Sequence, residues 1–167
     1  IALGDTFVKI SSTAMLQRVM PSVRKLFDGK QMGVGCRGGS ELVVHRMRRL
    51  WEENKSPDSA ICTIDARNAF NCLHRARIID AIGRHKDFDD LVPLFELEYG
   101  QHSKFYFTDR ILLSQSGVRQ GSCLGPLWFA LAIHVDIVKI LDRYSEHGVT
   151  GYLYLDDITL HGPAIAT

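Results

Sequence analysis

Two adjacent aspartates, Asp156 and Asp157, stand in the middle of an otherwise apolar segment near the end of the chain. Residues 151–155 before them alternate as a β-strand does, and residues 158–160 resume the strand after them. This pattern predicts a hairpin that carries both acids at its tip. Because adjacent like charges repel, such a tip requires compensation, and a divalent cation would supply it. A solvated turn is the alternative when this pair is taken alone.

A third carboxylate, Asp65, ends a second short segment, Ser59–Asp65, which is apolar, contains β-branched residues and follows a turn. Such a segment favours a buried strand over a helix. If the two strands are neighbours, their ends bring three carboxylates to one point. Carboxylate oxygens suit Mg²⁺ better than zinc, and a pair of such ions serves phosphoryl transfer. The alternative for Asp65 is the N-cap of a following helix.

The remaining pattern alternates between helical and strand spacing. Apolar residues at helical spacing predict helices over residues 7–27, with a bend or an interruption at Pro21, and over 40–51, 73–82, 91–99 and 126–141. Ser40 is the expected N-cap of the second of these helices. Residues 104–108 and 111–115 predict a hairpin with Asp109-Arg110 as its loop. This order predicts an α+β domain whose antiparallel sheet is backed by helices on one face.

Composition excludes several classes of protein. The 167 residues, 46% hydrophobic and 23% charged, match a soluble domain rather than a fibrous or disordered chain. Because the net charge is only +1, a nucleic-acid partner would have to be held by local patches. The spacing of the four cysteines matches no zinc site and favours a reduced compartment. The longest apolar run is too short to span a membrane.

A glycine-punctuated polar loop over residues 116–126 leads directly into the apolar helix predicted from residue 126. Glycines allow the backbone to approach a ligand closely, and the start of a helix offers free N–H groups to phosphate or sugar oxygens. The loop matches neither the Walker nor the Rossmann pattern. Its place in the chain, between the two acidic strands, makes it a candidate for ligand contact.

Three segments, in this order and spacing, resemble motifs A, B and C of reverse transcriptases, most closely those of non-LTR retrotransposons. They are Ile64-Asp65-Ala66-Arg67-Asn68-Ala69-Phe70-Asn71, residues 116–126, and Tyr154-Leu155-Asp156-Asp157. Residues 31–35 and 38–45 resemble the fingers segment of the same family. The resemblance covers essentially the whole chain. It implies a polymerase palm with partial helical fingers, the fingers segment over residues 1–58 and the palm over 59–167.

The resemblance also implies site residues. Asp65, Asp156 and Asp157 would hold two Mg²⁺ ions, or Mn²⁺ in their place, with the Ala66 carbonyl as a further ligand. Phe70 would stack under the sugar and exclude a ribose 2′-hydroxyl; its alternative is an ordinary core residue. The incoming nucleotide and the template would be contacted by three loop residues, Arg119, Gln120 and Gly121. A solvated surface position is the alternative for Arg119.

Nucleic-acid contacts are implied for Lys9 and for Tyr154, which would lie near the primer end. Arg46, Arg48 and Arg49 could also contact phosphates, although charges on an exposed helix face are commonly just solvated. The implied activity is RNA-directed DNA synthesis, with an RNA template, a DNA primer and deoxynucleoside triphosphates as partners. A retroelement protein of this kind would act inside the cell, in the nucleus.

Two other functions remain open on the sequence. A domesticated copy could keep the palm as a nucleic-acid-binding scaffold without turnover, and an RNA-dependent RNA polymerase shares the same palm. Both ends of the chain are expected to be cuts through a longer protein, with the thumb absent. We therefore expect residues 1–167 alone to have little or no activity.

Overall fold

The computed structural model describes residues 6–119 and 121–165, apart from the side chains of Phe105 and Phe107. The chain divides into two compact units. The first unit consists of Ile1–Met20 and Asn68–Ala132, and the second of Pro21–Arg67 and Ile133–Thr167. Within the described residues, no helix is both long and apolar enough to cross a membrane.

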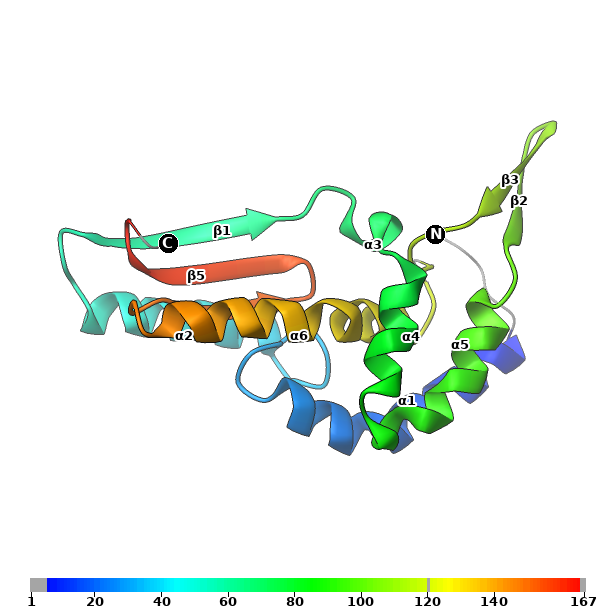
Figure 1. Ribbon diagram of the computed structural model, residues 1–167, viewed down its shortest axis with the longest axis horizontal. Helices are drawn as coiled ribbons and strands as arrows, with labels where there is room; N and C mark the ends of the chain where they lie inside the picture. The colour runs from blue at the N-terminus through cyan, green and yellow to red at the C-terminus, as the bar shows by residue number, and fades with distance from the viewer. Residues whose placement is uncertain (1–5, 120, 166–167) are drawn as a thin grey trace. The chain divides into compact units, whose positions relative to one another are not determined.

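The helices and strands follow the α+β order that the sequence predicts (Figure 1). The helices are α1 (Thr6–Phe27), α2 (Gly39–Glu53), α3 (Ala69–Cys72), α4 (Arg75–Gly83), the 3-10 helix η1 (Lys86–Leu91), α5 (Val92–Tyr99) and α6 (Gly125–Ser145). The strands are β1 (Ser59–Asp65), β2 (Ser103–Phe107), β3 (Arg110–Ser114), β4 (Thr150–Tyr154) and β5 (Asp157–Pro163).

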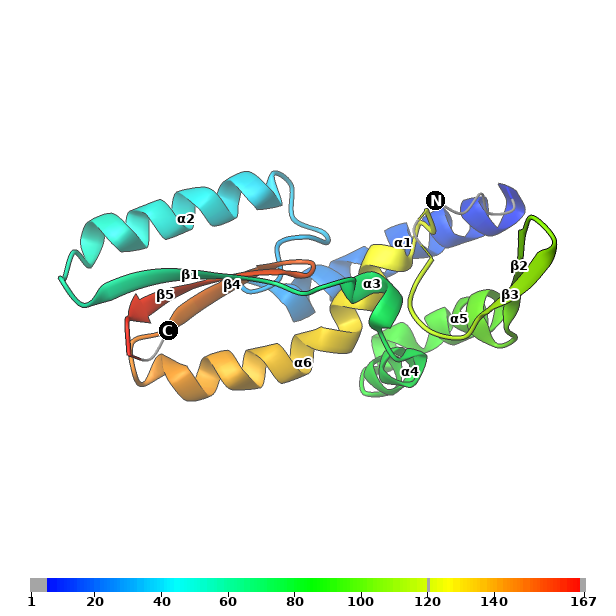
Figure 2. The same ribbon diagram turned by 90° about the horizontal axis from the view of Figure 1, so that it is seen from above.

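The second unit is built on an antiparallel sheet with the strand order β1-β5-β4. Helix α2 covers one face of this sheet and the second half of α6 covers the other (Figure 2). Tyr152 packs toward α2, whereas a Cβ at Gly151 would meet Leu141 of α6. The prediction of helices on one face was therefore wrong. Both faces of β4 carry groups that must be covered, since Leu153 is fully buried and Tyr152 half-buried.

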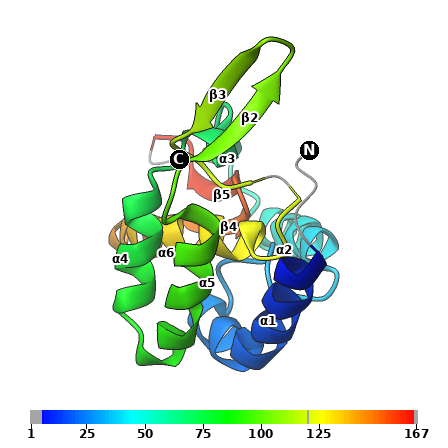
Figure 3. The same ribbon diagram turned by 90° about the vertical axis from the view of Figure 1, so that its right-hand side faces the viewer.

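The first unit holds α4 and α5 side by side, joined through η1, with the β2–β3 hairpin extending away from them (Figure 3). Its core contains Trp128, Ile78 and Leu91, all fully buried. The hairpin is confirmed, but its loop lies one residue earlier than predicted. Phe107 pairs with Arg110, so that the loop is Thr108-Asp109, and Thr108 adopts the positive φ of 53° that the tight turn requires.

Two helix predictions also differ from the structure. Helix α1 continues through Pro21 instead of breaking there. Its stripe of buried Val19, Val23 and Phe27 offsets the cost of about 3 kcal/mol for an interior proline. Helix α2 begins at Gly39, one residue before the predicted cap Ser40, and its N-cap is Gly38, which has the positive φ of 64° that glycine adopts readily.

Candidate functional site

The three strands of the second unit bring acidic side chains into one row. Asp65, the last residue of β1, pairs directly with Asp157, the first residue of β5, and Asp157 pairs in turn with Tyr154 of β4. Directly opposed residues of an antiparallel sheet share a face and lie close together. The two strand ends therefore place two carboxylates, from positions 92 residues apart in the sequence, beside each other on one face of the sheet.

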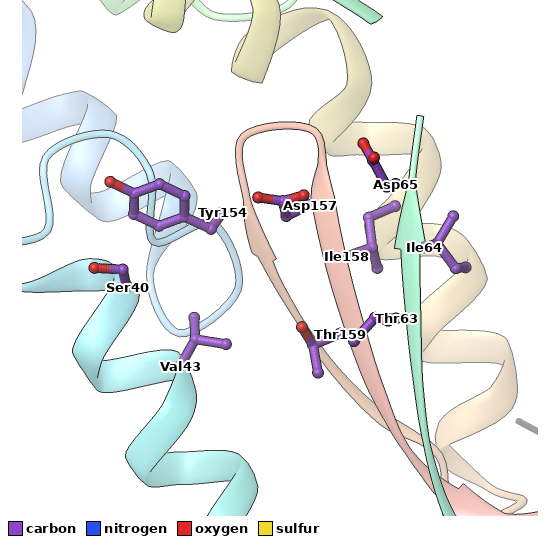
Figure 4. Close-up of a pocket in the computed structure, with 9 residues that line it drawn as sticks. All are labelled: Ser40, Val43, Thr63, Ile64, Asp65, Tyr154, Asp157, Ile158 and Thr159. Carbon is purple, nitrogen blue, oxygen red and sulfur yellow. The ribbon is translucent and has the colours of Figure 1, made fainter. Parts of the chain in front are cut away.

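These two carboxylates border a cavity of about 320 Å³ on the face of the sheet that α2 covers. Figure 4 shows Asp65 and Asp157 at the end of the cavity nearest to the hairpin turn, with Tyr154 and Ser40 on its other side. The remaining lining residues are Val43, Thr63, Ile64, Ile158 and Thr159. Both carboxylates are exposed. The cavity is thus open to a ligand at its acidic end.

Asp156 lies in the turn between β4 and β5, half-buried and outside the lining of this cavity. The residue before it, Leu155, has a φ of 58°, which is unusual for a bulky side chain. Within the described part of the chain, none of the three acids forms a salt bridge. Among the described residues, no basic side chain therefore pairs with these acids.

The acidic residues of the second unit suit one mode of binding a divalent cation and not another. The described residues contain no group of three or more His, Cys, Asp or Glu side chains arranged to hold a metal. Mg²⁺, however, is commonly bound by one or two carboxylates, while water and substrate phosphates complete its shell. The opposed pair Asp65 and Asp157, exposed at a cavity and without a basic partner, fits that mode of binding. It does not fit a metal cage built only from protein ligands.

The glycine-rich loop belongs to the first unit, and α3 and α4 hold its beginning. The Gly117 N–H donates to Leu73 O (2.8 Å) and the Val118 N–H to Phe70 O (2.9 Å). The Arg75 guanidinium donates to Gly117 O, Ser116 O and Ser114, at 2.7 to 3.1 Å. Burial lowers the pKa of Arg75 from its usual value. Arg75 was not predicted from the sequence, because nothing local distinguishes a half-buried arginine that holds a loop.

Two neighbouring residues at the end of α5 hold the rest of the loop. The buried Glu98 carboxylate accepts hydrogen bonds from Ser122 Oγ (2.8 Å) and Trp128 Nε1 (3.1 Å). The Tyr99 hydroxyl accepts the backbone N–H of Arg119 (3.0 Å). Burial raises the pKa of Tyr99 to about 12. The loop is therefore fixed by side chains from outside it, which the sequence did not indicate.

The predicted loop residues have different surroundings. Arg119 donates to Glu98 O (2.9 Å) and to Ser103 Oγ, and its guanidinium lies 5.7 Å from the centre of the Tyr99 ring. Protein groups thus engage this side chain, so Arg119 is not an ordinary solvated surface arginine. Gly121 is exposed with a φ of 104°. Gln120 lies outside the described residues.

The other predicted residues divide between the two units. Phe70 is half-buried in the first unit and stacks on Phe129, with ring centres 4.4 Å apart. Lys9 of α1 is half-buried there as well. Tyr154, in the second unit with Asp65, Ala66, Asp156 and Asp157, packs against the apolar cluster of Met32, Val43 and Met47. The structure thus joins the acids and Tyr154 in one unit and the loop residues with Phe70 in the other.

The arginines of α2 are not one uniform charged face. The Arg46 guanidinium lies 5.2 Å from the centre of the Tyr152 ring and donates to Gly29 O (3.4 Å). Arg49 pairs with Glu53 at 2.7 Å, and Arg48 is exposed. Of the three, Arg46 and Arg49 therefore have partners within the chain.

Comparison with known proteins places these features in a family. No protein-family model matches the chain. Over 98% of its length the chain is 30% identical to the retrotransposable element SLACS 132 kDa protein of Trypanosoma brucei gambiense, and it spans 14% of that protein. Among solved structures, apo telomerase from Candida tropicalis, truncated from its C-terminal domain, is similar. The match covers 92% of this chain and 34% of the telomerase chain. That match has a TM-score of 0.54 and 11% identity, so the likeness concerns the fold.

The α+β fold with its antiparallel sheet is therefore the one found in this region of telomerase. The homology to the retrotransposon protein extends over nearly the whole chain and includes the segments that resemble motifs A, B and C. The chain is a reverse-transcriptase-like domain of the non-LTR retrotransposon type. The family predicted from the motifs is confirmed.

Proposed function

We propose that this chain is the fingers-palm core of an RNA-directed DNA polymerase, which adds deoxynucleotides to a DNA 3′-hydroxyl on an RNA template. The observation that carries the proposal is the direct pairing of Asp65 with Asp157 at an open cavity, in a chain of this family. Residues 1–58 would contribute to the fingers and 59–167 to the palm. Retroelement replication is the process that such an enzyme serves.

Asp65 and Asp157 are the proposed metal ligands, with Asp156 and the Ala66 carbonyl as further oxygen donors next to them. When bound, Mg²⁺ neutralises the charge that develops on the transferring phosphate and activates the attacking oxygen. The chain's own contribution is positional: the β1–β5 pairing sets the distance between the two carboxylates, and the cavity leaves room for water and phosphate oxygens.

The first unit supplies the proposed contacts to the nucleotide. The loop around Gly121 would approach the incoming nucleotide and template, with Arg119 and Gln120 beside it. Phe70 would lie under the sugar, and its stacking on Phe129 would hold the ring in a fixed orientation. Lys9 and Tyr154 are the proposed contacts to the nucleic-acid backbone and the primer end.

Primer extension tests this function. A protein that contains this chain is incubated with an RNA template, a labelled DNA primer, Mg²⁺ and either deoxynucleoside or ribonucleoside triphosphates. We expect extension with deoxynucleotides, and its loss in Asp65→Asn, Asp156→Asn and Asp157→Asn. The matched control is Asp142→Asn, which changes an exposed aspartate of α6 in the same unit.

Three outcomes would contradict the proposal. Activity that survives in the Asp65 and Asp157 variants would reject the metal ligands. Preferential use of ribonucleotides would favour an RNA-dependent RNA polymerase. Tight binding of template and primer without extension would favour a domesticated nucleic-acid scaffold.

A further inference from the structure

We propose that Gln31 is a positioning residue that holds the carboxylate turn, Tyr154–Asp157, in the conformation that presents its two acids. This inference rests on the proposed function, because it concerns the acids assigned there to the metal. It concerns a residue outside the three motifs, in the segment that follows α1. All of the contacts that carry it lie within the second unit.

The segment around Gln31 runs beside β4. The Leu153 N–H donates to Lys30 O (2.9 Å), and the Met32 N–H donates to Leu153 O (2.7 Å). Together these bonds form an isolated parallel bridge between Gln31 and Leu153. The segment is thus fixed on the strand that leads into the carboxylate turn, two residues before Leu155.

One side-chain oxygen joins this segment to the turn itself. Gln31 is 2% exposed, and its Oε1 accepts the backbone N–H of Leu155 (3.0 Å) and that of Gly33 (2.8 Å). Leu155 is the turn residue with a φ of 58°. A left-handed conformation in a residue of this kind is strained and persists only where the surroundings hold it. The hydrogen bond to Gln31 Oε1 is donated by the backbone N–H of this strained residue, Leu155.

Gly33 packs closely against the same residue, Leu155. A Cβ at position 33 would lie 2.6 Å from Leu155 Cγ and 2.7 Å from the Leu155 backbone nitrogen. An alanine there would therefore press on the peptide group that Gln31 binds. Two positions of the segment therefore affect Leu155. Gln31 accepts its N–H, and Gly33 leaves the space that its backbone and side chain occupy.

The glutamine at this position acts through its oxygen and not through its nitrogen. Its Nε2 is buried and has no hydrogen-bond partner among the described residues. An apolar side chain of the same size would avoid the cost of this unpartnered donor. It would also remove the acceptor for the N–H groups of Leu155 and Gly33. The contribution of the glutamine is therefore this oxygen, which binds the turn.

The consequence for the acids is direct, because Asp156 and Asp157 follow Leu155 in the chain. If the φ of Leu155 leaves the left-handed region, the path of the backbone through both acids changes. Asp157 would then no longer lie opposite Asp65, and the two carboxylates would lose their common orientation. Binding sites need their ligands held to within about 0.5 Å, so this displacement would weaken the site without removing a ligand.

The test measures Mn²⁺ binding by electron paramagnetic resonance, with Mn²⁺ alone as the probe, and hydrogen exchange of the Leu155 amide. Gln31→Met removes the acceptor at nearly constant volume, whereas Gln31→Glu keeps an oxygen in its place. Gly33→Ala presses on the same peptide from the other side. The control Val149→Ala truncates a buried residue of the second unit, which makes it a comparable packing defect away from the turn.

We expect Gln31→Met and Gly33→Ala to weaken Mn²⁺ binding by about 10-fold or more, which is typical for groups that orient metal ligands. Leu155 amide exchange should become faster in Gln31→Met. Gln31→Glu and Val149→Ala should stay within about 2-fold of the unchanged chain. Circular dichroism of each variant shows whether it is folded under the conditions of the titration.

Two outcomes overturn the inference, and they are distinguishable. If Asp65→Asn and Asp157→Asn abolish Mn²⁺ binding but Gln31→Met binds as the unchanged chain does, the metal site stands and Gln31 does not position it. If Mn²⁺ binding is the same in the unchanged chain and in Asp65→Asn, the proposed metal site itself has failed. Equal weakening by Val149→Ala and Gln31→Met would show a general loss of packing, and would also overturn the inference.

Discussion

At the scale of single residues, the buried carboxylate of Glu98 holds two side chains of the first unit. It is 4% exposed and serves as the acceptor for both Ser122 and Trp128. Hydrogen bonds to a charged group contribute about 1.5–3 kcal/mol each, and an unsatisfied buried donor costs about as much. Glu98 therefore connects the end of α5 with the glycine-rich loop and with the core of the first unit.

We predict that Glu98→Ala lowers the free energy of unfolding by about 3 kcal/mol, because it leaves the Trp128 indole N–H buried without an acceptor. Glu98→Gln keeps one oxygen and should cost about half as much. Urea denaturation followed by tryptophan fluorescence measures both. Glu96→Ala, an exposed position on the same helix, is the control and should be close to neutral. Equal stability of the two Glu98 variants would contradict this account.

The neighbouring Tyr99 gives a prediction for alkaline pH. Burial raises its pKa from 10.0 to about 12, so the folded state favours the protonated phenol. The stabilisation from this shift is complete below pH 10 and is lost as the pH rises toward 12. It amounts to about 2–3 kcal/mol. Tyr99→Phe should therefore be less stable than the unchanged chain at pH 8, by about 1 kcal/mol for the lost hydrogen bond to Arg119.

Between pH 10 and 12 this difference should shrink and then reverse, since phenylalanine has no proton to lose. Urea denaturation of both proteins across this pH range measures the difference in unfolding free energy. The subtraction removes the contribution of lysines that titrate in the same range. A difference that stays constant from pH 8 to 12 would show that Tyr99 does not titrate differently in the folded state.

At the scale of elements, the glycine-rich loop depends on close contact with α3. Gly117 has a φ of 71°, and a Cβ there would lie 2.6 Å from the backbone atoms of both Phe70 and Asn71. We predict that Gly117→Ala destabilises the chain by at least about 2 kcal/mol, because backbone atoms cannot move aside as a flexible side chain can. Gly83→Ala, with open space around it, should be close to neutral. Thermal unfolding compares the two variants.

The helices and strands also show which parts of this fold can be predicted from patterns in the sequence. Helices α4, α5 and α6 and both hairpins follow from apolar spacing, because that spacing is a local property. The turn at Thr108-Asp109 was misplaced by one residue, since neither candidate loop contains a glycine to fix the register. The course of α1 through Pro21 depends on burial along the helix, which the local sequence does not report.

In the candidate site, too, local sequence patterns predict some residues, whereas others depend on tertiary contacts. Asp65, Asp156 and Asp157 were predicted from their positions beside apolar strand segments together with the resemblance to motifs A and C. That Asp157 and not Asp156 lies opposite Asp65 depends on strand register, which the pattern left undetermined. Gln31, Arg75 and Glu98 act on segments 24 to 124 residues away in the sequence, so no local motif could assign them. Their roles follow only from the tertiary contacts.

At the scale of the whole molecule, the division into two units differs from the order of the chain. Two of the three boundaries fall within helices, in α1 between Met20 and Pro21 and in α6 between Ala132 and Ile133, and the third lies between Arg67 and Asn68. Each unit therefore joins an early segment of the chain to a late one. The proposed fingers (residues 1–58) and palm (59–167) are consecutive segments defined by their expected function. The two units are instead defined by which residues pack together, so their boundaries need not coincide with residue 58.

The acids of the second unit lead to a prediction about the stability of the molecule. Like charges directly opposite each other in a sheet are destabilising, and no basic side chain of the described chain pairs with Asp65 or Asp157. In EDTA, Asp65→Asn should therefore be more stable than the unchanged chain, by about 0.2–1 kcal/mol. A functional site would in this way reduce the stability of its own fold.

Addition of Mg²⁺ should reverse the order of the two proteins. A ligand that binds only the folded state stabilises it by RT ln(1 + [L]/Kd), so the unchanged chain should gain about 2.7 kcal/mol at 100 times its Kd. Asp65→Asn lacks one of the two opposed ligands and should gain little. Asp142→Asn, at an exposed position of α6, should respond as the unchanged chain does. Urea denaturation in EDTA and in Mg²⁺ measures all three. A lower stability of Asp65→Asn in EDTA, or an equal gain from Mg²⁺, would mean that the opposed carboxylates neither repel each other nor share a cation.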